Sequence, residues 1–117
     1  MSPIPPRKPV PEELTARLQA AGIWQMANAA YYGVFVREGC MVVAKRDPGT
    51  GVYTSLGSSG YPLEGVGVAY LQWDGDQPFL FHKDCGMVPA TPEQVETLRK
   101  FSADVTAALG LEQAASA

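Results

Sequence analysis

The stretch YYGVFVREGCMVVAKR, residues 31–46, decides the fold class of this chain. Two runs rich in β-branched and aromatic residues flank a Glu-Gly pair, and glycine at such a connection favours a β-hairpin because it readily takes positive φ. Pairing across the turn puts Phe35 opposite Val42 on one face and Val34 opposite Val43 on the other. Both faces are apolar, whereas a sheet face open to water is normally polar. We therefore expect both faces of this hairpin to be covered.

A second hairpin is predicted further along the chain. VGVAYLQW (66–73) and PFLFHK (78–83) are joined by the turn residues DGDQ, and again both faces of the first run are apolar. Between the hairpins, VYTSL (52–56) predicts a short strand, and GSSGYPLEG (57–65) predicts a loop because it is rich in glycine. IWQMANAA (23–30) is ambiguous between an extension of a helix and a first strand.

Helices are predicted at both ends of this β-rich region. PEELTARLQAAG (11–22) has acidic residues in its first turn, where the helix dipole favours them, and a glycine able to end the helix. TPEQ, beginning at Thr91, is a capping box with proline at the first helical position, and Gly110 suits a Schellman stop. The apolar stripe between these two signals consists of Val95, Leu98, Phe101, Val105, Ala108 and Leu109.

These elements predict an α+β fold. It contains an antiparallel sheet of about five strands, made of the two β-hairpins and one short strand, flanked by an N-terminal and a C-terminal helix. We expect a single domain over residues 12–111. Residues 1–11 hold five prolines, which favour an extended Pro-rich arm. Residues 112–117 are expected to form a frayed tail.

Composition narrows the function classes. The formal net charge is −3 and the nine Lys and Arg residues are dispersed, which argues against a nucleic-acid partner. No run approaches the about 20 apolar residues that a bilayer-spanning helix needs, and the N-terminus lacks the apolar region of a secretory signal. We therefore expect a cytoplasmic protein with reduced cysteines and no membrane partner. Only 18% of the residues are charged, so some apolar surface is expected to meet a partner.

The hexapeptide FHKDCG, residues 81–86, concentrates the side chains that carry chemistry. One hypothesis makes His82, oriented by Asp84, the base for a nucleophilic Cys40 or Cys85. A zinc site would need all four of these residues, and we predict no metal and no cofactor. In the simplest interpretation His82 ends a strand and Cys85 packs inward as a small apolar residue. We therefore assign no catalytic residue.

Aromatic residues suggest a different kind of site. Tyr61, Tyr70 and Trp73 lie in or beside the second half of the predicted sheet. A cupped sheet under a helix can leave a pocket lined by such side chains and few charges, which is how many apolar small molecules are held. These three residues are the candidate ligand-binding residues.

Three function classes follow, in order of preference. The first is a non-catalytic interaction protein that acts through self-association, as a homodimer, or through another protein. The second is a small-molecule binder with an aromatic-lined apolar pocket. The third is a small enzyme with a cysteine nucleophile and His82 as its base. Because the chain offers few convergent catalytic groups, we favour the classes without enzymatic activity.

Overall fold

In the computed structural model of the chain, residues 11–111 are described. The Pro-rich arm predicted for residues 1–11 and the frayed tail predicted for residues 112–117 lie outside this range, apart from Pro11, which begins the first helix. The elements in chain order are α1 (Pro11–Ala20), β1 (Trp24–Asn28), β2 (Tyr32–Arg37), β3 (Cys40–Arg46), β4 (Tyr53–Leu56), β5 (Gly60–Leu63), β6 (Gly67–Asp74), β7 (Gln77–His82), β8 (Gly86–Pro89) and α2 (Pro92–Leu109).

The strands form one antiparallel sheet. Its hydrogen-bonded order is β1-β2-β3-β5-β6-β7-β8, and β4 pairs with β3 as well. The α+β class and the two flanking helices are thus confirmed. The predicted number of about five strands is wrong, because the sheet has eight.

The additional strands are short or have atypical composition. The ambiguous segment 23–30 contains β1, which pairs with β2 and carries an irregularity between Gln25 and Ala27. The predicted loop 57–65 contains β5, which is four residues long and joins β3 only through the pair of Met41 and Gly60. β8 is also four residues long, and like β5 it contains both glycine and proline. Such short segments provide too few residues for an alternating pattern to be visible.

The first hairpin forms as the sequence predicts. Glu38 has φ 50° and Gly39 has φ 85°, and two consecutive positive values are those of a tight type I′ hairpin turn. Phe35 pairs with Val42, and Val34 pairs with Val43 on the opposite face. The turn chemistry therefore sets the register of β2 against β3.

The ends of α2 also agree with the sequence. The Thr91 hydroxyl accepts a hydrogen bond from the Gln94 backbone N–H (3.1 Å), and the Gln94 side chain accepts one from the Thr91 N–H (2.9 Å). At the other end Gly110 is left-handed, and the Leu111 N–H donates to the Thr106 carbonyl at 3.0 Å. These are the bonds of a capping box and a Schellman stop.

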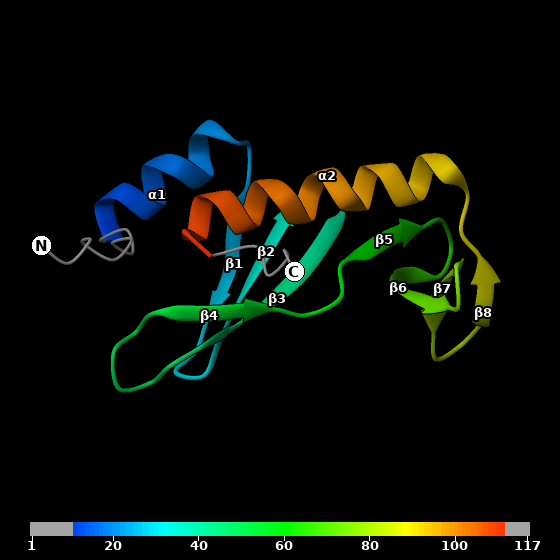
Figure 1. The fold of residues 1–117 in the computed structure, drawn as a ribbon, viewed down its shortest axis with the longest axis horizontal. Helices are drawn as coiled ribbons and strands as arrows, with labels where there is room; N and C mark the ends of the chain where they lie inside the picture. The colour runs from blue at the N-terminus through cyan, green and yellow to red at the C-terminus, as the bar shows by residue number, and fades with distance from the viewer. Residues whose placement is uncertain (1–10, 112–117) are drawn as a thin grey trace, which may run out of the picture.

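The helices and the sheet form two layers. Both helices lie on the same side of the strands, and α2 runs along the sheet from the β8 end to the β1 end (Figure 1). The core lies between the layers, and among its fully buried side chains are Phe35, Val42, Leu80, Leu98, Phe101, Val105 and Leu109. Among residues 11–111 no helix covers the opposite face of the sheet. The expectation that both faces are covered is therefore met on one face only within the described chain.

Candidate interaction surface

The sheet face away from the helices carries a row of apolar side chains that crosses every strand of the main path. Paired residues in antiparallel strands project on the same face, so the pairings can be followed from strand to strand. Starting from β1, the row consists of Trp24, Val36, Met41, Gly60, Tyr70, Phe81 and Met87. We call it the transverse row. None of its members is charged.

Contacts within the transverse row confirm that its members are neighbours. The Tyr70 hydroxyl lies 3.5 Å from the Met41 sulfur. A Cβ atom added to Gly60 would lie 3.1 Å from the Tyr70 ring and 2.3 Å from a methyl carbon of Val68. Glycine at position 60 therefore allows the side chains of β6 to lie over β5 and keeps the row continuous between the two halves of the sheet.

A second row on this face is also without charge. It consists of Ala27, Val34 and Val43 in one half of the sheet and of Gln72, Phe79 and Pro89 in the other. Within residues 11–111, the charged residues of this face lie near strand ends or in turns, at Glu38, Lys45, Glu64, Asp74 and Lys83. The two rows together define what we call the helix-free face.

Large apolar side chains on this face are exposed in the single chain. Trp24 is 75% exposed, Met87 48% and Phe81 39%, whereas Val36, Met41 and Tyr70 are half-buried. Scattered exposed apolar residues are ordinary, but a contiguous apolar area marks a contact surface. The aromatic and methionine content of the transverse row is typical of the centre of a protein interface.

Three of the residues predicted for chemistry, His82, Asp84 and Cys85, lie together at the end of β7 and in the turn after it, whereas Cys40 lies apart on β3. His82 ends β7, and its Nδ1 atom accepts a hydrogen bond from the Asp84 backbone N–H at 3.0 Å. The Asp84 carboxylate is 3.8 Å from the same nitrogen. Cys85 is exposed in the following turn and does not pack inward as predicted, whereas Cys40 is buried. Two strands separate β3 from β7 in the sheet, which puts these cysteine-bearing regions about 14 Å apart.

Cys40 has the environment of an inert thiol. It is 4% exposed and faces the core. Burial raises the pKa of the Cys40 thiol above its ordinary value, although the nearby Arg37 guanidinium acts in the opposite direction. The thiolate, which is the nucleophile, is therefore disfavoured at neutral pH.

Iodoacetamide at neutral pH is expected to label the native protein at Cys85 and to leave Cys40 unmodified until the chain is unfolded. Peptide mass spectrometry measures both sites. A Cys85→Ser variant should take up no label while folded. Rapid labelling of native Cys40, lost on His82→Ala, would instead favour the cysteine enzyme.

The three candidate ligand-binding residues do not share one face. Tyr61 pairs with Ala69 and packs against the core on the helix side. Trp73 is on the same face of β6 as Leu71, while Tyr70 projects to the helix-free face. The alternation of the sheet thus separates Tyr70 from the other two residues.

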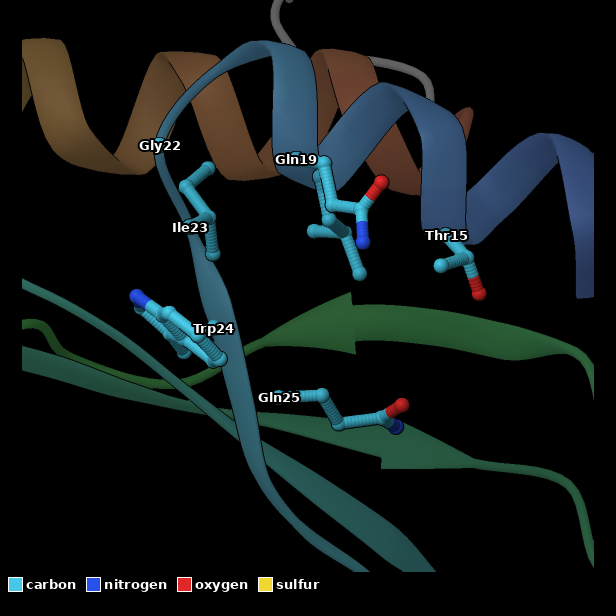
Figure 2. A pocket seen from close by; sticks show the side chains of 7 residues that line it. Thr15, Gln19, Gly22, Ile23, Trp24 and Gln25 are labelled. Carbon is cyan, nitrogen blue, oxygen red and sulfur yellow. The ribbon is translucent and has the colours of Figure 1, made fainter.

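A cavity of about 400 Å³ lies between α1 and β1. Thr15 and Gln19 reach down from α1, and Gln25 projects from β1 below them (Figure 2). Apolar walls come from Leu18 and Ile23, both of which are buried. Its volume is at the lower end for small-molecule sites, and Tyr61, Tyr70 and Trp73 are not among its lining residues.

A polar cluster next to this cavity holds neighbouring strands and loops together. The Gln25 amide donates to the Tyr53 hydroxyl at 2.7 Å, and Arg46 donates to the Asn28 side chain and to the Gly51 carbonyl. Burial raises the pKa of the Tyr53 phenol, against a smaller opposing effect of Arg46. The guanidinium is already satisfied by these partners, so the cluster is explained by its structural role.

Further features restrict the chemistry of the described chain. Among residues 11–111 no group of three or more His, Cys, Asp or Glu side chains is arranged to hold a metal ion. Neither α1 nor α2 has the length and apolar character to cross a bilayer.

Known protein families, curated proteins and solved structures provide no match to this chain.

Proposed function

We propose that this chain is a non-catalytic interaction protein that self-associates, with the helix-free face as the contact surface between two copies. The observation that carries the proposal is the uncharged transverse row, which extends from Trp24 in β1 to Met87 in β8. Burying apolar area is the main favourable term in protein association. A second copy brings the same uncharged surface, so neither partner has to bury an unpaired charge in the centre of the contact.

The size of the helix-free face supports the proposal. Seven strands lie side by side in the main path of the sheet. With a spacing of about 4.8 Å and strands about 18 Å long, they have a flat footprint of about 600 Å². Side chains corrugate this footprint and increase its accessible area, which brings it close to the about 800 Å² per partner of a standard stable interface. The cytoplasmic location predicted from the sequence remains part of this proposal.

A second protein, a small apolar ligand and a cysteine enzyme are the alternatives from the sequence. Another protein would need a matching apolar surface, whereas a second copy of the chain supplies one of known chemistry. Small-molecule binding would use the cavity between α1 and β1. Cys40 and His82 lie on different strands separated in the sheet order. Cys85 lies in the turn that follows His82, but its thiol contacts the Gly86 carbonyl, and the His82 Nδ1 atom accepts from the Asp84 backbone N–H. The enzyme hypothesis therefore has the least geometric support.

Sedimentation equilibrium at micromolar concentration is expected to give twice the 12.5 kDa mass of one chain. The measurement should be repeated over a dilution series, because association follows mass action and dilution releases monomers. A monomer at all accessible concentrations would contradict the proposed function. A mass larger than that of a dimer would contradict the use of a single closed interface.

A further inference from the structure

We propose that the two-fold axis of this dimer lies in the interface and runs nearly parallel to the strands, along β5, so that β1 of one copy covers β8 of the other. This inference rests on the proposed self-association. β5 is the fourth of the seven strands in the main path and therefore its middle. Two twisted sheets stacked in this way have nearly aligned strands, which is the common arrangement of packed sheets.

The sizes of the side chains in the transverse row match under this axis. Rotation places Trp24 over the partner's Met87, Val36 over the partner's Phe81 and Met41 over the partner's Tyr70. Each contact joins a large ring to a smaller or more flexible side chain, and two of them bring methionine sulfur to an aromatic ring, which is a favourable contact. At the axis Gly60 meets its own copy, so the backbones can approach closely there.

The charges at the border of the helix-free face match as well. Lys45 lies two residues beyond Val43 in β3, and Asp74 lies two residues beyond Gln72 in β6, so both stand next to the uncharged second row. The rotation exchanges β3 and β6. Glu38 and Lys83 follow the ends of β2 and β7, on the opposite border, and these strands also exchange places. Lys45 thus faces the partner's Asp74, and Glu38 faces the partner's Lys83.

Within residues 11–111 of a single chain, none of these four charged residues forms an ion pair. Each therefore has its charge available for a partner copy. The same axis brings Glu64, in the turn between β5 and β6, toward its own copy beyond the apolar rows, and this like-charge contact acts against the axis. Opposite charges at the border of an interface specify orientation more than they add affinity.

An axis perpendicular to the strands is the main alternative. It would place each strand over its own copy, with Trp24 on Trp24 and Phe81 on Phe81. Large side chains would then face each other at the ends of the transverse row, and a gap would remain at Val36. The same axis would turn Glu38 onto the apolar second row, which leaves a charge without a partner. Both size and charge favour the axis parallel to the strands.

Charge reversal tests the orientation directly. Glu38→Lys and Lys83→Glu each place like charges together at two symmetric contacts, and each variant is expected to dimerise about tenfold more weakly than the parent chain. A one-to-one mixture of the two variants restores opposite charges at both contacts, so it should form a heterodimer with affinity near that of the parent. The double variant in one chain should also recover. Lys45→Glu and Asp74→Lys provide a second, independent pair with the same expected pattern.

Sedimentation or fluorescence-detected association at low salt measures these affinities, with circular dichroism confirming that each variant is folded. A dimer in which the single reversals have no effect, or in which mixing does not restore affinity, would overturn the proposed axis and leave self-association intact. A parent chain that is monomeric throughout would overturn self-association itself. Recovery of affinity in the one-to-one mixture would support both the proposed axis and self-association.

Discussion

Phe81→Arg is expected to convert the proposed dimer into monomers at micromolar concentration. Phe81 lies in the transverse row between Tyr70 and Met87 and is 39% exposed in the single chain. An aromatic residue that is a hot spot of an interface contributes about 2 kcal/mol or more, and arginine would in addition bring a charge into an apolar contact. Because the two-fold axis repeats the change on both copies, we expect the dissociation constant to rise by about a factor of 10³.

Trp73→Arg is the matched control for this variant. Trp73 is another exposed aromatic residue, 55% exposed, but it projects from β6 on the side opposite to Tyr70. The same class of substitution there should leave the dissociation constant within about threefold of the parent value, as for a residue outside the contact. Analytical ultracentrifugation of both variants measures the difference. Equal dissociation by both variants would indicate a general loss of structure, and no dissociation by Phe81→Arg would exclude the helix-free face as the contact.

Phe101→Ala is expected to cause the largest loss of folding stability. The ring of Phe101 is 1% exposed in the core between α2 and the sheet. The Arg37 guanidinium lies 5.5 Å from the ring centroid and is itself held by Asp104 at 2.8 Å. Removal of a buried phenyl ring leaves a cavity and typically costs about 3–5 kcal/mol. For a domain of this size the melting temperature should fall by about 12 °C or more.

Phe81→Ala removes the same atoms from the opposite face and is the control for this second prediction. At a dilution where the parent chain is monomeric, Phe81→Ala should lower the free energy of unfolding by less than about half as much as Phe101→Ala does. The reason is that Phe81 is already partly exposed in one chain. Urea unfolding followed by circular dichroism gives both free energies of unfolding. A loss below about 1 kcal/mol for Phe101→Ala would contradict the assignment of this ring to the core.

Signals that depend on a few neighbouring residues were read correctly from the sequence. The capping residues Thr91 and Gln94 and the left-handed Gly110 define the ends of α2 through bonds made within one turn of helix. The Glu-Gly turn defines the register of β2 against β3 in the same local way. The apolar pairs predicted for both faces of this hairpin are present, and within residues 11–111 the helices cover one of these faces.

Three strands were not predicted because their formation depends on distant partners. β5 and β8 have four residues each, and a segment of this length acquires strand geometry only when a neighbouring strand supplies its hydrogen bonds. Gly60 illustrates the difference. Its glycine-rich surroundings predict a loop, whereas in the folded chain its missing side chain leaves the space over which Tyr70 packs. Residues 23–30 were ambiguous for the same reason, as β1 is stabilised by β2.

Local residue patterns were enough to establish the α+β class, the helix ends, the first hairpin and the apolar character of both of its faces, because each depends on interactions between residues close in the chain. Only the folded molecule decided which face the helices cover and which residues align across seven strands. That alignment depends on the long-range pairing of Met41 with Gly60, and the free energy of such pairing comes from side chains far apart in the chain, which no short pattern encodes.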